Sequence, residues 1–507
     1  MSDSYIDIQP SKNTSKQAET SSYRDIFKAT SLFGGLQAYQ IVIQILRSKF
    51  VAVLLGPEGM GISGLLLSGT QLVQSFTSLG LSQSAVRDVA EANGSSDVNK
   101  VKRTISVLRK LVWITGLLGM LVVVLASPLL SKTSFGDYSF TLSFIFLSVI
   151  MLFDQLSAGQ KVALQGLRKY SYLAKATAIG ITSGLIVSIP LYYFLGKDGI
   201  IPAFVVNSFV TLLLSKHFSD KLKINSIKVS IKDCFTEGKK MLTLGFVMSL
   251  NGILVYACAY IVKAFISNNG GLAEVGLFNA GFTIVNVYVG MVFSAMSTDY
   301  YPRLAAVNND NKKCSELINR QSEVSLLILS PVISVALIFT PIMLSILYSD
   351  KFLLANEYVR WALFGMLFRT MSWSIGNVFF AKGESKLCTF TTITFNILFL
   401  IDDLIWYYFM GVAGLGISFA LNYFFHLISV YLIARHRYSF SFGKQTVKLF
   451  VTLLLFSIIA AGITFIKNEV YRYVLGIMII VLTTFYSLKT IAGYIDIKGI
   501  LTTKIKR

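Results

Sequence analysis

The sequence predicts an all-α integral membrane protein with about fourteen transmembrane helices. Of its 507 residues, 54% are hydrophobic and only 14% are charged, whereas soluble domains carry about 25% charged residues. The mean hydropathy is +0.64. Apolar runs of about 20 residues, the length that crosses the hydrocarbon core of a bilayer, recur along the chain. These three observations exclude a soluble globular protein.

Fourteen apolar segments are long enough to span the membrane. The first two and the eleventh and twelfth are separated only by short glycine-containing turns, so these two divisions are the least distinct. The segments are 31–55, 60–82, 111–130, 140–163, 172–194, 199–216, 241–266, 275–298, 323–347, 359–381, 387–409, 412–434, 446–466 and 472–492.

The opening segment 1–28 is polar and predicts a disordered cytoplasmic tail rather than a signal peptide, because no apolar core follows a basic start within it. The four cysteines are scattered without a CxxC motif, and the three histidines show no ligand spacing. The sequence therefore predicts no disulfide framework, no metal site and no cofactor.

Lysine and arginine fall on alternate loops. With the N-terminus placed inside, 36 of the 46 cationic residues lie in cytoplasmic segments, six lie outside and four lie within spans. Because cytoplasmic loops hold the excess of Lys and Arg, both termini are predicted to be cytoplasmic. The net charge of +20 then reflects topology, aided by anionic membrane lipid, and no nucleic-acid partner is expected.

The chain contains an internal repeat. Residues 191–200 read LYYFLGKDGI and residues 406–415 read WYYFMGVAGL, 215 positions later. Gly61 and Gly276 have the same spacing. Further pairs are Gly196/Gly411 and Gly199/Gly414 at 215, and Gly159/Gly376 and Gly166/Gly383 at 217. Each copy holds six spans, an even number, so the copies enter the membrane in the same orientation, as in transporters with parallel repeats.

The repeat divides the chain into five parts. We expect a disordered tail, a six-helix N-terminal lobe, a basic cytoplasmic linker, a six-helix C-terminal lobe, and two further helices with a basic tail. The predicted boundaries are 1–28, 29–216, 217–240, 241–435 and 436–507.

The stretch KFVAVLLGPEGMGISGLLLS (49–68), followed by VRDVAEANG (86–94), resembles the polysaccharide flippase family, more narrowly its O-antigen translocase branch within the multidrug/oligosaccharidyl-lipid/polysaccharide exporter superfamily. TDYYPRLAAV (298–307) is a second family-like segment. The motif residues are Lys49, Ala52, Leu55, Gly56, Pro57, Gly59, Gly61, Val89, Ala90 and Glu91. The resemblance implies alternating access and an undecaprenyl-diphosphate-linked oligosaccharide as substrate, in the bacterial inner membrane.

Four cations lie within predicted spans, where charge is costly and marks functional sites. Arg369 lies near the bilayer midplane and is either a cavity cation for the diphosphate or an ion-pair partner of Asp154. Arg47 continues a polar stripe with three glutamines on the first span, whereas the family motif favours Lys49; the two side chains point about 200° apart on a regular helix. Lys263 either lines the cavity or reaches the outer interface.

The remaining polar candidates are carboxylates and amides. Asp402 and Asp403 are candidates for coupling transport to H⁺ or Na⁺, or for a structural pair. Gln71, Asn279 and Asn286 suit sugar hydroxyls because amides both donate and accept hydrogen bonds; contacts between helices are the alternative.

Two other function classes compete with the flippase. A drug exporter of the same superfamily would favour an acidic cavity, whereas the span cations exceed the three span anions by one. A polymerase or membrane glycosyltransferase would need a long external loop or an acidic catalytic site, and the sequence contains neither. We therefore expect a transporter and no enzyme activity.

Overall fold

The structure, a computed structural model, describes residues 12–95, 97–224 and 227–494, and its regular elements are all helical. The elements are α1 (Lys12–Thr77), α2 (Leu81–Gly94), α3 (Val98–Phe135), α4 (Thr141–Gly166), α5 (Tyr170–Leu195), η1 (Gly196–Gly199), α6 (Ile200–Asp220), α7 (Ile231–Gly270), α8 (Leu272–Phe282), the π-helical η2 (Thr283–Val289), α9 (Met291–Ala306), α10 (Asn311–Leu347), η3 (Asp350–Ala355), α11 (Asn356–Ala381), α12 (Ser385–Tyr438), α13 (Lys444–Ile463) and α14 (Glu469–Tyr494).

Ten helices of the described residues are long and apolar enough to cross a membrane. Three of them, Gly34–Thr77, Tyr170–Asp220 and Ser385–Tyr438, each cover two of the predicted segments. The predicted segment 359–381 corresponds to α11, which is not among the ten and carries Arg369 within its apolar stretch. The protein is thus an all-helical, multi-pass membrane protein, and the count of fourteen spans stays a prediction.

Glycine forms the bends at the ends of the helical hairpins. Gly56 (φ 69°, ψ −170°) bends α1, and Gly271 (φ 87°, ψ 175°) separates α7 from α8. Gly196 (φ 57°, ψ −132°) and Gly411 (φ 59°, ψ −145°) bend the chain after α5 and within α12. Both pairs have the sequence offset of the repeat, and positive φ favours glycine because it has no Cβ. The backbone therefore repeats its geometry at the predicted spacing.

The expected spacing of 217 at one turn is wrong. Gly383 has a φ of 71°, and its counterpart with positive φ at the offset of 215 is Arg168 (φ 58°) rather than Gly166. The amide N–H that follows each of them donates to the carbonyl oxygen five positions back, Lys169 to Leu164 at 2.8 Å and Glu384 to Phe379 at 3.1 Å. Counting glycines misaligned this turn, because an arginine occupies the left-handed position in the first copy.

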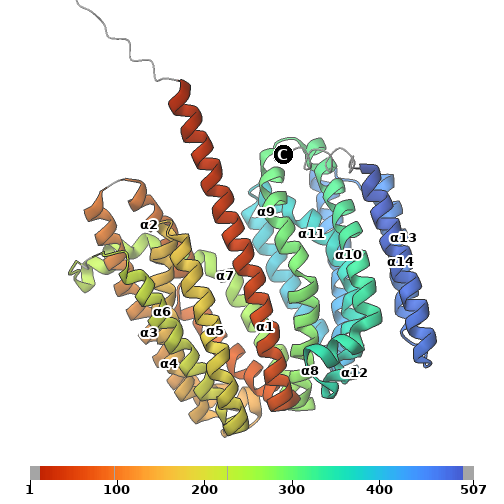
Figure 1. Cartoon of the computed structure of the whole chain (residues 1–507), viewed down its shortest axis with the longest axis horizontal. Helices are drawn as coiled ribbons and strands as arrows, with labels where there is room; N and C mark the ends of the chain where they lie inside the picture. Colours follow the sequence, from red (N-terminus) through yellow and green to blue (C-terminus); the bar gives the residue numbers. More distant parts are fainter. Residues whose placement is uncertain (1–11, 96, 225–226, 495–507) are drawn as a thin grey trace, which may run out of the picture.

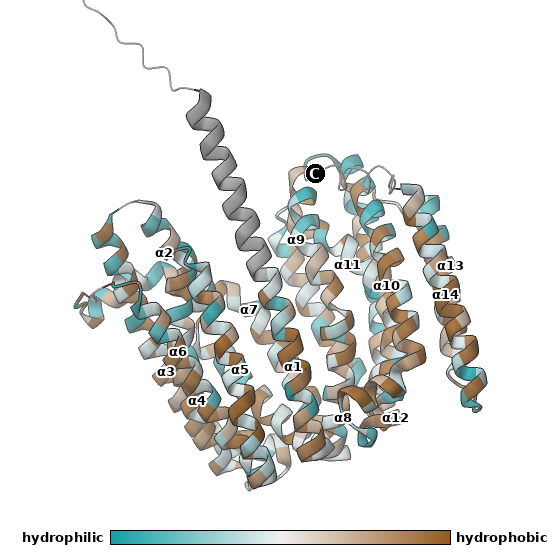
Figure 2. Cartoon of the chain, viewed as in Figure 1, coloured by the Kyte–Doolittle hydropathy of each residue, from teal (hydrophilic) through white to brown (hydrophobic). Residues whose placement is uncertain are grey.

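The helices form two groups that converge at one end (Figure 1). Helices α2 to α6 make one group and α8 to α12 the other, with the start of α1 between them at the diverging end. Helices α13 and α14 pack against α10 on the far side of the second group. Much of the outward-facing surface of the helices is apolar (Figure 2). On α3, Leu117, Leu121, Leu125 and Leu129 are each more than half exposed, which suits contact with lipid.

Helix α7 packs on both groups of helices, but most of its polar contacts are with the first group, although the sequence assigns it to the second lobe. The hydroxyl of Tyr260 forms hydrogen bonds with the hydroxyls of Thr133 (2.5 Å) and Ser134 (2.9 Å) at the end of α3. The amide of Asn268 donates to the Thr133 carbonyl oxygen at 2.7 Å. Nearer its start, α7 packs Gly245 against the backbone of Leu79 and Gly80. The polar contacts that hold α7 are therefore concentrated on the first lobe.

Two predicted boundaries also differ from the structure. Residues 12–28, expected to be disordered, are helical as the start of α1, while residues 1–11 lie outside the described part. Helix α7 begins at Ile231, inside the predicted linker 217–240. Ser230 caps it by accepting a hydrogen bond from the Asp233 amide, a local signal for a helix start. Both segments are polar in composition, and for this reason the sequence did not predict them to be helical.

Candidate functional site

A cavity of about 590 Å³ lies where the two groups of helices converge. Its walls come from both arms of the α1 hairpin and from α5, α6, α7 and α8. The bend at Gly56 brings residues 40–51 of the first arm opposite residues 60–71 of the second. The lining residues are Gln40, Ile43, Gln44, Arg47, Ser48, Val51, Met60, Ser63, Gly64, Leu67, Gln71, Ile181, Tyr192, Phe204, Asn207, Thr211, Lys263, Asn279 and Thr283.

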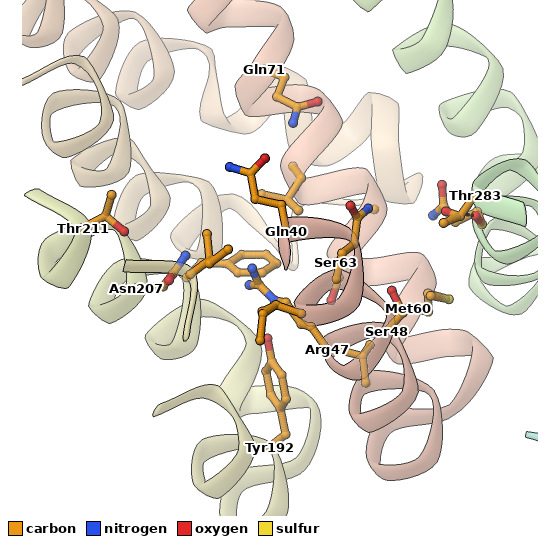
Figure 3. A pocket seen from close by; sticks show the side chains of 18 of the residues that line it. Gln40, Arg47, Ser48, Met60, Ser63, Gln71, Tyr192, Asn207, Thr211 and Thr283 are labelled. Atoms are coloured by element: carbon orange, nitrogen blue, oxygen red, sulfur yellow. Dashed lines mark hydrogen bonds between the residues drawn. The ribbon is translucent and has the colours of Figure 1, made fainter. Parts of the chain in front are cut away.

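The charged side chains that line this cavity are both cations. Arg47 enters from α1 and Lys263 from α7, and none of the described residues that line the cavity is an aspartate or glutamate. The Arg47 guanidinium lies 5.7 Å from the centre of the Phe204 ring, and Figure 3 shows it between α1 and the neighbouring helices of the first lobe. A cavity with two cations and no carboxylate favours an anionic ligand.

Several polar atoms around the cavity are buried without a hydrogen-bond partner within the described residues. They are the hydroxyls of Ser63 and Tyr192 and the amide nitrogen of Asn279. The Tyr192 hydroxyl points toward the Arg47 side chain (Figure 3). Buried polar groups are normally paired, so these groups are suited to bind water or a polar ligand.

Lys49 lies outside the cavity lining. Its ammonium group donates to the carbonyl oxygens of Ser345 (3.0 Å) and Tyr348 (2.7 Å), at the end of α10. Free carbonyls at a helix C-terminus attract cations, so Lys49 holds the α1 hairpin against α10. Of the two candidate cations on the first span, Arg47 lines this cavity and Lys49 does not.

Arg369 extends the polar surface toward the diverging end. Asn279, Thr283 and Asn286 follow one another at helical spacing along α8 and η2, and the first two line the cavity. The Arg369 guanidinium donates to the side-chain oxygen of Asn286 at 2.7 Å. It also lies over the rings of Phe293 (5.2 Å) and Tyr423 (5.3 Å). The same nitrogen also donates a long hydrogen bond to the Met366 sulfur at 3.8 Å, and within the described residues the Nε and Nη2 groups donate no other hydrogen bond, so they are available for a ligand.

The expected ion pair between Arg369 and Asp154 is wrong. Asp154 on α4 accepts a hydrogen bond from the Ser208 hydroxyl of α6, in the other group of helices. Asp154 and Arg369 are instead counterparts in the repeat, and their partners Ser208 and Tyr423 are counterparts as well. The two lobes thus place opposite charges at equivalent positions.

Asp402 and Asp403 lie apart from the cavity, within the α12 hairpin. The Ser418 hydroxyl donates to Asp403 at 2.5 Å and lies 3.4 Å from Asp402. It also accepts a hydrogen bond from the Asn422 amide at 3.0 Å. Asp402 lines a second cavity of about 390 Å³ whose other lining residues are mainly apolar. Among the described residues, no cluster of three or more His, Cys, Asp or Glu side chains is arranged to hold a metal ion.

The sequence placed Arg47, Lys263, Gln71 and Asn279 among the candidates, and all four line the cavity. It missed the wall formed by α5 and α6, which includes Tyr192, Phe204, Asn207 and Thr211. Asn207 and Thr211 are four positions apart, so their helical spacing was the available signal. Asn286 and Lys49 lie beyond the lining.

A sequence profile of the family described as "Polysaccharide biosynthesis protein" matches residues 50–357. The chain is similar to a protein of Shigella flexneri named "Putative O-antigen transporter", with 23% identity over 405 residues, covering 77% of this chain and 93% of that protein.

Solved structures share the fold. An inward-facing multidrug resistance MATE family transporter of the MOP superfamily has a TM-score of 0.65 and 16% identity, covering 79% of this chain and 94% of that one. The lipid II flippase MurJ in an inward closed conformation has a TM-score of 0.63 and 13% identity, covering 95% and 100%. The chain therefore belongs to the polysaccharide biosynthesis protein family and shares its fold with these multi-pass membrane transporters.

Proposed function

We propose that the protein is a flippase that carries an undecaprenyl-diphosphate-linked oligosaccharide, an O-antigen or related repeat unit, across the bacterial inner membrane. The observation that carries this proposal is the cavity that Arg47 and Lys263 line without a carboxylate among its described lining residues. The similarity to a protein named as an O-antigen transporter supports the class of substrate.

The cavity chemistry suits each polar part of such a substrate. Diphosphate carries about two negative charges, and arginine binds phosphate oxygens through paired, charge-assisted hydrogen bonds. Arg47 and Lys263 are the primary phosphate ligands in this proposal, with Arg369 beyond Asn286 as a further cation. The amides of Gln71, Asn279 and Asn286 and the neighbouring hydroxyls would bind sugar hydroxyl groups.

The transport cycle would be alternating access between two six-helix lobes, with fourteen spans and both termini in the cytoplasm. The matched bends at Gly56 and Gly271, and at Gly196 and Gly411, support this division. The helix groups diverge at the end where α2 lies (Figure 1), which the charge distribution assigns to the cytoplasm. The cavity would thus receive substrate from the inner leaflet.

Asp402 and Asp403 would couple the cycle to H⁺ or Na⁺. Two adjacent carboxylates that share one serine hydroxyl repel each other when both are ionised, so a proton or a metal cation between them is favoured. Asp154, the repeat counterpart of Arg369, accepts a hydrogen bond from Ser208 of the same lobe. Through this bond it would follow any movement of that lobe.

The test is export of surface glycan in cells that depend on this protein. We expect Arg47→Ala and Lys263→Ala to lower export at least tenfold at normal abundance in the membrane, and purified Arg47→Ala to bind polyprenyl-diphosphate-linked oligosaccharide more weakly. The control is Lys132→Ala. Lys132 lies in the last turn of α3, where its ammonium group is over the Tyr138 ring. Wild-type export by the Arg47→Ala/Lys263→Ala double variant would reject the proposal, and loss of resistance to a cationic drug would favour a drug exporter.

A further inference from the structure

A second polar groove, of about 600 Å³, lies between α2 and α7, away from the cavity. Three cations, Arg87 from α2 and Lys239 and Lys240 from α7, line it together with one carboxylate, Glu237, and two threonines. Leu244 and Val247 form its apolar wall. Along α7, the groove therefore has cations at one end, Lys239 and Lys240, and apolar side chains at the other, Leu244 and Val247.

The carboxylates near the groove offset its positive charge only in part. Glu237 accepts three hydrogen bonds of 2.6–3.0 Å from the Arg103 guanidinium. Glu91 lies 3.9 Å from the Lys240 ammonium, and both side chains are more than half exposed, so this pair is weak. Burial raises the pKa of the Asp88 carboxyl, while the charges of Lys240 and Arg87 act in the opposite direction.

Among the described residues, the other two cations of the groove are not held in ion pairs, although the Asp88 carboxyl is close enough to Arg87 for their charges to interact. Arg87 and Lys239 form no salt bridge within the part of the chain that the structure describes. The described lining residues thus include three cations and one carboxylate, Glu237, which is bound to Arg103, so the net charge of the groove lining is positive.

The apolar end continues along α7. Phe246, Val247 and Leu250 are exposed to 44%, 58% and 48%. Lys240 precedes Val247 by seven positions, about 10 Å at 1.5 Å per helical residue. A cation followed by an exposed apolar face at this distance matches a lipid phosphate at the interface and its hydrocarbon chain below it.

We propose that this groove binds the phosphate headgroup of an anionic lipid of the inner leaflet, with one of its chains lying along α7. The proposal goes beyond the flippase activity and rests only on the cytoplasmic orientation assigned to α2. Arg87, Lys239 and Lys240 bind the phosphate, and Leu244, Val247 and Leu250 contact the chain. The lipid thereby joins α7 to α2.

The experiment measures lipid bound to the purified full-length protein by native mass spectrometry. The probes are phosphatidylglycerol, undecaprenyl diphosphate and, as a zwitterionic reference, phosphatidylethanolamine. Since each cation near a membrane surface contributes about fivefold in affinity for anionic lipid, the Arg87→Ala/Lys239→Ala/Lys240→Ala variant should bind phosphatidylglycerol more than tenfold more weakly and phosphatidylethanolamine unchanged. Val247→Glu, which keeps all three cations, should also weaken binding.

The matched control is Arg303→Ala/Lys312→Ala/Lys313→Ala, which removes three cations at the same end of the second lobe. Equal loss in this control, or no loss in the groove variant, overturns the site. If the triple variant aggregates, Lys239→Gln, a single change of an exposed residue, replaces it with an expected loss of about fivefold.

Undecaprenyl diphosphate bound in place of phosphatidylglycerol would identify the groove as a docking site for substrate, and preference for phosphatidylglycerol would identify a bound membrane lipid. The cavity variant Arg47→Ala should retain groove binding, which separates failure of this site from failure of the flippase proposal.

Discussion

Gly61 and Gly276 pack against each other's hairpins reciprocally. A Cβ on Gly61 would overlap the carbonyl oxygen of Leu272, and a Cβ on Gly276 would overlap the carbonyl oxygen of Pro57. Leu272 is the counterpart of Pro57 in the second copy of the repeat. Exchanging each residue for its repeat counterpart converts the first contact into the second. The contact between α1 and α8 therefore has a local two-fold axis.

Gly64 and Asn279 mark the same relationship one turn further on. They are also counterparts in the repeat, and the Asn279 side chain occupies the space where a Cβ of Gly64 would lie. A residue that touches its own repeat counterpart lies close to the symmetry axis. The axis therefore passes beside the cavity, which explains why both lobes contribute to its walls.

We expect Gly61→Ala to weaken the contact between the hairpins, because a methyl group cannot fit against a backbone carbonyl without shifting a helix. The free energy of unfolding should fall by about 1–3 kcal/mol, measured in detergent by denaturant or thermal unfolding. Gly276→Ala should have a similar effect, and the double variant less than the sum because both changes affect one contact. Gly376→Ala is the control, since a Cβ there meets nothing within 4 Å; an equal effect of that change would contradict the argument.

Lys49→Met should destabilise the protein by about 1–3 kcal/mol, the cost of leaving a buried polar group without its hydrogen-bond partner, because two carbonyls at the end of α10 lose their ammonium donor. The measurement is thermal unfolding together with export per folded molecule. Lys132→Met serves as the comparison. If the Lys49→Met protein has wild-type stability but exports no glycan, Lys49 takes part in substrate binding instead.

Arg369→Ala should insert normally and lose most glycan export, while Arg369→Lys restores only part, because lysine cannot reproduce the planar pairing with phosphate. Adding Asp154→Asn should rescue neither variant, since Asp154 is bound to Ser208 rather than to Arg369. Immunoblots of membranes and staining of surface glycan provide the two readouts. Full rescue of export by Asp154→Asn would contradict both the structure and the role of Arg369.

The Asp402→Asn/Asp403→Asn variant should bind substrate and lose the dependence of transport on a proton or Na⁺ gradient. Ser418→Ala should shift this dependence without abolishing it, because the hydroxyl links the two carboxylates. Transport in vesicles with imposed gradients is the measurement. An unchanged response to both gradients in the double Asn variant would leave the pair with a structural role.

Reporter fusions should place the loops at residues 223, 308 and 441 in the cytoplasm and those at 137, 350 and 467 outside. The reason is the concentration of Lys and Arg on one set of loops. Paired cytoplasmic and periplasmic reporters make each position its own control. An inverted result at 223, beside the loop richest in cations, would reverse the whole topology.

The sequence by itself determined that this is a multi-pass helical membrane protein with an internal repeat, mostly at an offset of 215; that this offset also holds at Arg168 and Gly383 came from the structure. Apolar length and the requirement for glycine at positive φ are local properties, so Gly56 and Gly271, or Gly196 and Gly411, can be paired without coordinates. The candidates Arg47, Lys263, Gln71 and Asn279 followed from the cost of polar groups in hydrocarbon.

Only the tertiary structure decided which of these groups meet. Each residue turns a helix by about 100°, so Arg47 faces the cavity while Lys49, two positions on, faces α10. The partner of Asp154 and the packing of α7 on α3 depend on distances across helices that composition does not encode. The bend at Gly56 sets the direction of both arms of α1, and only that direction places their side chains around one space.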